Sequence, residues 1–178
     1  LPARVANEGL VSATSTAEVL FGTAESRARG VSIGVPSIVQ NDGTILASAS
    51  ASGLVGELRA ESHGVWLGQG HHSVANAGDV ISRAELSSRL FFGFVSGKAQ
   101  AIGIEAGDGG SRIVDEGRIV VDAVSSGEAT AVGIRTGSGD DLIVHQGSIV
   151  ATRTVGGVAM AGPEGVDQFG ESGHVAPL

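Results

Sequence analysis

The feature that most constrains this chain is a nine-residue pattern, centred on a glycine, that occurs five times. The five alternate positions of each copy follow one order. The first is Val or Ile, the second is Asn, Asp or His, the third is the glycine, the fourth is Val or Ile, and the fifth is mostly a small residue. The copies recur about every 33 residues, and a degenerate sixth copy surrounds Gly173. A period of two predicts extended strands that bury one face. The central glycines are Gly9, Gly43, Gly78, Gly117 and Gly147.

A second apolar motif precedes each later copy, so one repeat holds about three short strands. No such repeat can cover its own apolar face, whereas stacked repeats bury every Val and Ile column in one interior. The sequence therefore predicts an all-β chain folded as a parallel β-helix, or solenoid, of five to six rungs. A β-sandwich also explains the alternation, but it does not explain the recurrence of Asn7, Asn41 and Asn76 in register. The second motifs are residues 30–33, 64–67, 101–104, 131–134 and 157–160.

Insertions in the first three rungs interrupt the strands, at residues 14–29, 48–63 and 83–100. We expect them to project from one edge of the solenoid as lateral loops that form a lobe. The lobe is either a satellite core that closes over itself or an exposed patch that docks a partner. Charged residues such as Arg27, Arg59 and Glu61 would rim such a patch. Its apolar candidates are Phe21, Val55, Leu90, Phe91, Phe92 and Phe94.

Composition narrows the classes of partner. The 178 residues suit one domain, 1–178, and they include no Cys, so no disulfide framework or thiolate metal site is expected. A net charge of −8 disfavours nucleic acid as a partner, and no apolar run reaches the ~18 residues of a membrane span. Because the chain starts and stops inside the pattern, we expect a fragment or processed piece of a longer solenoid. End-to-end stacking of protomers is the alternative.

One column of polar residues is expected to lie on the buried face beside the turn glycines. Stacked amides satisfy one another, which favours a structural ladder of Asn7, Asn41, Asn76, Asp115 and His145. The alternative is acid–base chemistry at the C-terminal end of the column, where Asp115, His145 and Glu171 would lie one rung apart. Two other groups are weaker candidates.

The first is the segment TGSGDDLIV, which is close to a haemolysin-type calcium repeat, G-G-x-G-x-D-x-U-x, and makes calcium the one cofactor considered. Gly-Asp turns explain the same residues. The second is the histidine group of His63, His71 and His72, which we expect to be solvated turn residues. The calcium candidates are Gly137, Gly139, Asp140 and Asp141.

The columns V-x-N-x-G-x-[VI]-x-[AS], joined to Gly-rich turns such as 137–141, resemble the β-helical passenger regions of Gram-negative autotransporters and other large secreted bacterial repeat adhesins. The resemblance implies a right-handed parallel β-helix, export, and an extracellular or cell-surface role in adhesion or assembly. We therefore expect a non-enzymatic structural or adhesive β-helix that binds a protein or cell-surface partner or self-associates. The alternatives are a polysaccharide lyase or hydrolase on this scaffold, although the chain has one Trp and no Tyr, and a calcium-stabilised secreted repeat protein.

Overall fold

The computed structural model describes residues 1–88, 95–156, 158–161, 166–168 and 174–176. All regular structure in these ranges is β-strand. The strands are β1 (Ala3–Asn7), β2 (Leu10–Ile33), β3 (Ser37–Asn41), β4 (Thr44–Leu67), β5 (His72–Asn76), β6 (Asp79–Ser88), β7 (Val95–Ala106), β8 (Ser111–Asp115), β9 (Arg118–Ser125), β10 (Glu128–Thr136), β11 (Leu142–His145), β12 (Ser148–Val155), β13 (Val158–Ala161), β14 (Val166–Gln168) and β15 (His174–Ala176).

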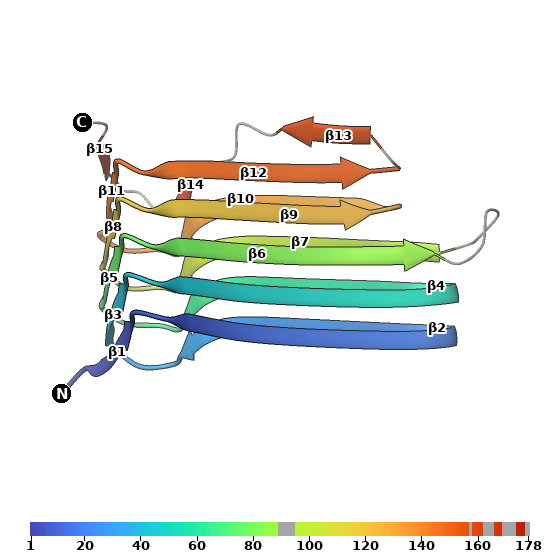
Figure 1. The fold of residues 1–178 in the computed structure, drawn as a ribbon, viewed down its shortest axis with the longest axis horizontal. Coiled ribbons are helices and arrows are strands. Elements are labelled where there is room, and N and C mark those ends of the chain that lie inside the picture. The colour runs from blue at the N-terminus through green and yellow to red at the C-terminus, as the bar shows by residue number, and fades with distance from the viewer. Residues whose placement is uncertain (89–94, 157, 162–165, 169–173, 177–178) are drawn as a thin grey trace.

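A six-stranded parallel sheet, which we call the wall sheet, stands at one side of the molecule (Figure 1). Its strand order is β1-β3-β5-β8-β11-β15, so each strand pairs with its equivalent one repeat along the chain. The register stacks Val39 on Val74 and Val74 on Ile113, and these side chains are at most 2% exposed. Like residue therefore lies over like residue, and the predicted β-solenoid is confirmed.

The second sheet forms long arms that run away from the wall sheet and return (Figure 1). The first half of β4 pairs with β6 and its second half pairs with β7, so one strand crosses the molecule twice. The bends occur at Gly22 and Gly56, whose φ angles of 111° and 138° favour glycine. The insertions 14–29 and 48–63 project laterally as predicted, but they are paired strand along nearly their whole length, so the prediction that they are loops was wrong. The same holds for the described parts of 83–100, which belong to β6 and β7.

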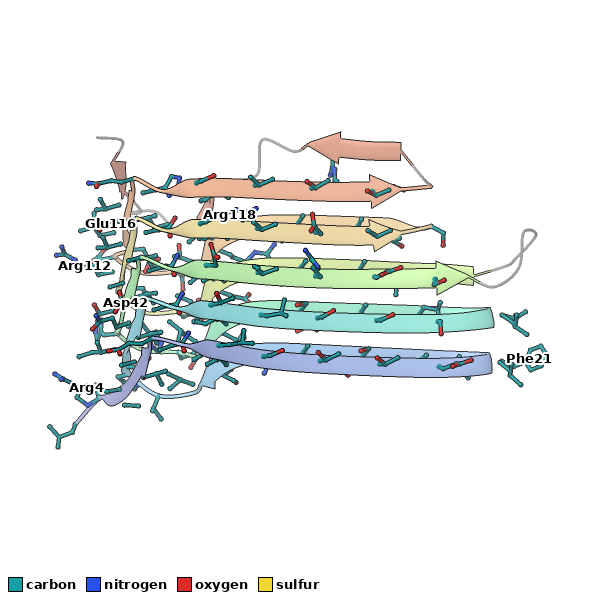
Figure 2. The ribbon with its side chains drawn as sticks, viewed as in Figure 1. Arg4, Phe21, Asp42, Arg112, Glu116 and Arg118 are labelled. Carbon is teal, nitrogen blue, oxygen red and sulfur yellow. The ribbon has the colours of Figure 1, made fainter. Side chains whose placement is uncertain are left out.

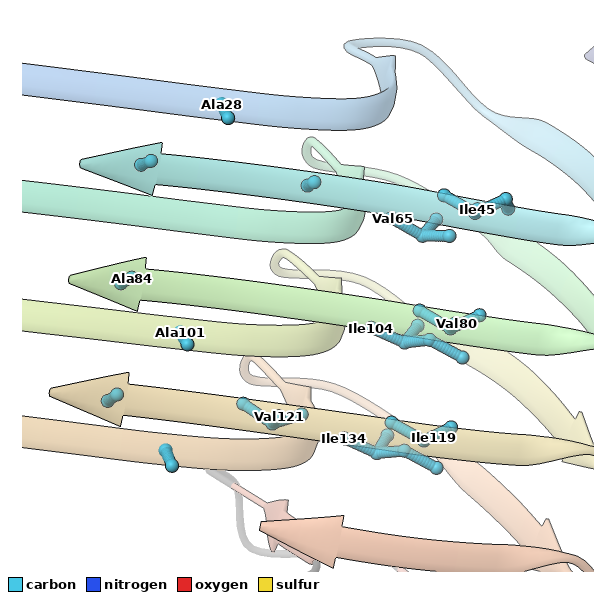
Figure 3. Packing of buried hydrophobic residues seen from close by; sticks show 14 of the residues in the cluster. Ala28, Ile45, Val65, Val80, Ala84, Ala101, Ile104, Ile119, Val121 and Ile134 are labelled. Atoms are coloured by element: carbon cyan, nitrogen blue, oxygen red, sulfur yellow. The ribbon is translucent and has the colours of Figure 1, made fainter. Parts of the chain in front are cut away.

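Mostly small side chains fill the space between the outbound and return arms, together with a few leucines such as Leu58 and Leu86. Ala47, Ala49 and Ala51 of β4 are at most 1% exposed, and they alternate with more exposed residues on the outer face. Larger side chains pack near the wall sheet, where Ile45, Val80 and Ile119 lie close to Val65, Ile104 and Ile134 (Figure 3). Burying one large aliphatic side chain stabilises a fold by about 1.5–3 kcal/mol. The largest apolar contribution therefore comes from this part of each rung.

A file of glycines allows the return arm to turn beside this core. A Cβ on Gly30 would lie 2.5 Å from Ile45 Cγ2 and 2.7 Å from Gly64 O, and Gly64 and Gly103 are equally confined by the next rung. The strand register aligns Val65 with Ile104, not with Ile102. The second apolar motif therefore occupies 103–106 and 133–136 in its third and fourth copies, two residues later than predicted.

The solenoid has about four turns, fewer than the five to six rungs predicted. After β12 the chain reverses, and β13 pairs antiparallel with β12 instead of continuing a parallel arm. The segment that contains Val158 was predicted to be a second-motif strand of the stacked repeats; it is a strand, but it lies antiparallel along the edge of β12. Among the described residues after β13, the three-residue strand β14 alone continues the return arm, by pairing with the end of β10.

Candidate functional site

The five polar side chains of the predicted ladder lie in one hydrogen-bonded file beside the wall sheet. Asn7 Nδ2 donates to Asn41 Oδ1 at 2.8 Å, and Asn41 Nδ2 donates to Asn76 Oδ1 at 2.7 Å. The adjoining turns repeat the same backbone bonds, since Asp42 N and Gly43 N both donate to Asn7 O. The column therefore satisfies buried amides that would each cost about 1–3 kcal/mol without partners.

Asp115 ends this run of amides. Its Oδ1 accepts from Asn76 Nδ2 at 2.6 Å, and its Oδ2 accepts from His145 Nδ1 at 2.8 Å. A carboxylate has no proton to donate, so the amide donors from one side and the imidazole from the other converge on it. Asp115 is 0% exposed, and both of its oxygens are engaged, which supports a structural rather than a catalytic role. The third catalytic candidate, Glu171, lies outside the described residues.

The predicted calcium turn lies at the corner between the return arm and the wall sheet. Asp141 is 4% exposed, and its Oδ1 accepts from Ser111 N at 2.8 Å. Gly139 has a φ of 134°, which a tight turn with glycine explains without a metal. In the described part of the chain, no group of three or more His, Asp or Glu side chains is placed to hold a metal ion. Calcium binding by Gly137, Gly139, Asp140 and Asp141 stays a prediction.

Two of the three histidines predicted to be solvated are buried, so that prediction was wrong for His63 and His72. His72 is 4% exposed, with Nε2 at 2.8 Å from Gly68 O and Nδ1 at 2.9 Å from Ser37 Oγ. Because a carbonyl only accepts, His72 Nε2 carries the proton and, in the neutral ring, the serine donates to Nδ1. His63 is 3% exposed, and its Nε2 lies 2.6 Å from Glu105 Oε2. His71 alone is exposed.

The tips of the arms carry the partner-binding candidates that the structure describes. Phe21 is 72% exposed, Leu20 is 58% exposed, and Phe21 lies beside Val55 of the next rung. Figure 2 shows Phe21 at the end of the arm farthest from the wall sheet. These side chains form an exposed apolar file, which we call the tip file: Leu20, Phe21 and Val55. The candidates Leu90, Phe91, Phe92 and Phe94 lie outside the described residues.

The charged residues predicted to rim the apolar patch instead follow the outer face of the return arms. Arg59 Nη2 lies 2.7 Å from Glu57 Oε1, and Arg27 Nε lies 3.3 Å from Glu61 Oε2. Such exposed ion pairs contribute little to stability, typically about 0–1 kcal/mol. They provide a polar surface between the tip file and the corner of the solenoid.

A groove that sequence analysis missed lies at that corner, where the return arm turns toward the wall sheet. Three stacked segments line it, one from each of three consecutive rungs: 66–69, 105–108 and 135–138. The register stacks Trp66 on Glu105 and Glu105 on Arg135, so these side chains form one column across the rungs. The cavity volume is about 470 Å³, within the roughly 300–1,000 Å³ typical of small-molecule sites.

Residues next to the groove hold its side chains in place from the neighbouring rung. The Arg29 guanidinium carbon lies 4.3 Å from the centre of the Trp66 ring, and His63 bonds Glu105. Both contacts join one rung to the next across the corner. Only the fold brings these residues together, because Trp66 and Glu105 are separated by the whole of the third outbound arm.

Two carboxylates of the groove are held ionised. Burial alone would raise the pKa of Glu105, but the hydrogen bond and charge of His63, together with the charges of Arg135 and Arg29, hold it below its ordinary value. The Ser138 backbone N–H and hydroxyl donate to Asp108 Oδ1 and lower the pKa of Asp108 as well. At neutral pH both side chains therefore accept hydrogen bonds and donate none.

The depressed pKa of Glu105 predicts a pH-dependent contribution to stability. A carboxylate with a lowered folded pKa stabilises the fold above its unfolded pKa, and this contribution is lost as the pH falls through the folded value. We expect Glu105→Gln to lower the melting temperature by about 5 °C at pH 7. The difference in melting temperature between this variant and the wild type should shrink below pH 4.5, the ordinary pKa of Glu105. Thermal melts between pH 7 and pH 3 measure it.

The exposed residue Glu85 provides the control for this prediction. Glu85→Gln changes the same charge far from His63, so its melting curve should follow that of the wild type at every pH. A difference between wild type and Glu105→Gln that grows on acidification would contradict the assignment of the His63–Glu105 pair as stabilising.

Comparison with known proteins adds no family to this description. The chain matches no protein-family model, no curated protein and no solved structure. The molecule is thus defined by its fold, a β-solenoid with flat lateral arms, and by two surface features, the tip file and the corner groove. Within the described ranges, no helix has the length and apolar character to cross a bilayer.

Proposed function

We propose that this chain is a non-enzymatic structural or adhesive β-solenoid, secreted or held at a bacterial cell surface, that presents binding contacts from the tips of its arms. The observation that carries the proposal is the tip file. Phe21 is 72% exposed and Val55 is 37% exposed, and they are paired side by side on adjacent rungs. Exposed apolar residues grouped in this way are typical of protein interaction sites.

The arms suit such a role because they hold the tip rigidly. The partners β2 and β4 pair in parallel from Leu10 to Ile33, and the alanine layer between the arms is buried. A partner that covers Phe21 gains about 1.5–3 kcal/mol from that side chain, with little ordering of the backbone to offset it. The extracellular or cell-surface location rests on the resemblance of the repeat to secreted bacterial β-helices.

Substitution at the tip tests the proposal. The assay uses beads coated with the protein and measures how many adhere to bacterial or host cells. We expect Phe21→Ser to reduce this adhesion about tenfold, because one large apolar contact is lost. Sedimentation velocity on the same variants measures whether self-association depends on the tip. The melting temperature should change by less than about 2 °C, because Phe21 is exposed.

A matched control is Val35→Ser, which changes another exposed apolar residue, 54% exposed, away from the arms. It should adhere and sediment like the wild type. Wild-type beads that neither adhere to cells nor self-associate would contradict the proposal, as would equal losses from Phe21→Ser and Val35→Ser.

A polysaccharide-acting enzyme on the same scaffold is the second candidate function. The corner groove favours it to the extent that Glu105 is ionised and lies 2.6 Å from a histidine nitrogen. Release of reducing sugar ends from a polysaccharide separates this candidate from the first.

A further inference from the structure

The corner groove combines an aromatic ring with polar side chains along the axis of the solenoid. Its wall is a column of Trp66, Glu105 and Arg135, and three rungs span about 10 Å at the usual strand spacing. The same groove continues past Asp108 and Ser138 in the turns. A ligand that follows the column therefore meets an apolar ring first and charged hydrogen-bonding groups next.

Trp66 offers the apolar surface that a sugar ring requires. An indole ring packs against the C–H face of a pyranose, and Arg29 at 4.3 Å fixes the orientation of this ring. The ring is half-buried, so part of it remains accessible in the groove. It is the chain's only Trp, and the sequence has no Tyr.

The polar groups of the groove match the hydroxyls of a sugar. Glu105 and Asp108 accept hydrogen bonds, and the guanidinium of Arg135 donates them. Each carboxylate is oriented in advance, Glu105 by His63 at 2.6 Å and Asp108 by Ser138 N at 2.9 Å. Such orientation reduces the entropy lost on binding.

The charge of the groove selects among sugars. Two carboxylates and one guanidinium line it, and the chain carries a net charge of −8, so an acidic polysaccharide would be repelled. An uncharged glycan is not repelled by the carboxylates, and its hydroxyls can bond both to the carboxylates and to the guanidinium. The same repulsion disfavours binding of a nucleotide or another polyanion in the groove.

We propose that the corner groove binds a short segment of an uncharged glycan, with Trp66 stacked on a sugar ring and Glu105, Asp108 and Arg135 bonded to its hydroxyls. This proposal rests on the proposed adhesive function, for which it names a second contact and its ligand class. It requires no bond to be broken in the sugar.

The fluorescence of Trp66 tests the proposal directly, because no other Trp or Tyr contributes to the emission. Cellohexaose, maltohexaose, xylohexaose and laminarihexaose serve as uncharged probes, and oligogalacturonate serves as the acidic probe. We expect at least one uncharged probe to change the emission saturably, with a Kd below about 1 mM, and oligogalacturonate to have no effect.

Calorimetric titration of variants assigns the contacts. Glu105→Gln and Asp108→Asn should each raise the Kd about tenfold, and Trp66→Ala should abolish the binding heat. Glu85→Gln is the matched control and should bind like the wild type. Circular dichroism melts establish that each variant is folded, and Trp66→Phe, which keeps a ring, replaces Trp66→Ala where that variant does not fold.

Three results would overturn the groove proposal: no response to any uncharged probe, a preference for oligogalacturonate, or an unchanged Kd in both Glu105→Gln and Asp108→Asn. Failure of the adhesive function is distinguishable, because Phe21→Ser should bind the oligosaccharides normally. Release of reducing ends from a bound probe would support the groove as the glycan site while contradicting the non-enzymatic function.

Discussion

Replacing Gly78 with alanine is expected to lower the melting temperature by about 10 °C, which corresponds to a loss of about 3 kcal/mol in the free energy of unfolding. A Cβ at this position would lie 2.9 Å from the backbone carbon of Asp42 and closer still to the Gly43 carbonyl oxygen. The obstacle is backbone, which cannot rotate away as a side chain can, so two rungs must separate locally.

The same file of glycines supplies the control. Gly9 lies at the end of the file, and a Cβ there would meet nothing within 4 Å. Gly9→Ala should therefore melt within about 2 °C of the wild type. Equal melting temperatures for Gly9→Ala and Gly78→Ala would show that contact between stacked turns does not limit these positions.

The second large effect is expected from Asn41→Leu, which interrupts the polar ladder. Asn76 Oδ1 would lose its donor, and Asn7 Nδ2 would keep only its bond to Thr44 O at 3.2 Å. A buried acceptor without a partner costs about 1–3 kcal/mol, and the leucine must also fit between stacked amides. We expect a loss of about 3 kcal/mol, measured by chemical denaturation.

Gln40 is the matched control for this substitution, because it precedes Asn41 in β3 but is exposed, with its amide bonded only to Asp42 Oδ2 at the surface. Gln40→Leu should change the free energy of unfolding by less than about 0.5 kcal/mol. If Asn41→Leu were as stable as Gln40→Leu, the ladder would contribute no net stability to the solenoid.

The stacking of rungs was predictable because its signal is local and repeated. Each copy places a branched apolar residue, a polar residue and a glycine at fixed spacing, and Val39, Asn41 and Gly43 lie over their equivalents in the next rung. The position of Asn76 next to Asp115 follows from the same register. Such agreement between neighbouring copies also determines which side chains face inward.

The arms were not predictable in the same way, because much of their interior is Ala, Ser and Gly, with only a few larger buried side chains such as Leu58 and Leu86. Ala49 and Ala51 are buried in β4, yet a run such as SASAS has no large apolar residues to mark an inward face. The small residues were therefore interpreted as loop. Their size is what lets the two arms pack closely over their whole length.

The groove was missed for a different reason. Its residues come from three rungs, and His63 and Glu105 are separated by more than forty positions with no spacing rule between them. The third and fourth copies of the second apolar motif were also placed two residues too early in the sequence. Trp66 was therefore aligned with Gly103 instead of Glu105. Only the observed register aligns Trp66 with Glu105.

The ladder also determines how a protein of this kind can lengthen by duplication. An amide both donates and accepts, so an extra repeat carrying Asn inserted between Asn41 and Asn76 would continue the file with every bond matched. A second repeat carrying Asp next to Asp115 would place two carboxylates against each other, and one of them would have to take up a proton to donate to the other. Duplication of an amide-bearing repeat thus leaves the bonding of the ladder complete at any pH, whereas duplication of the carboxylate-bearing repeat would make the stability of the ladder depend on uptake of a proton.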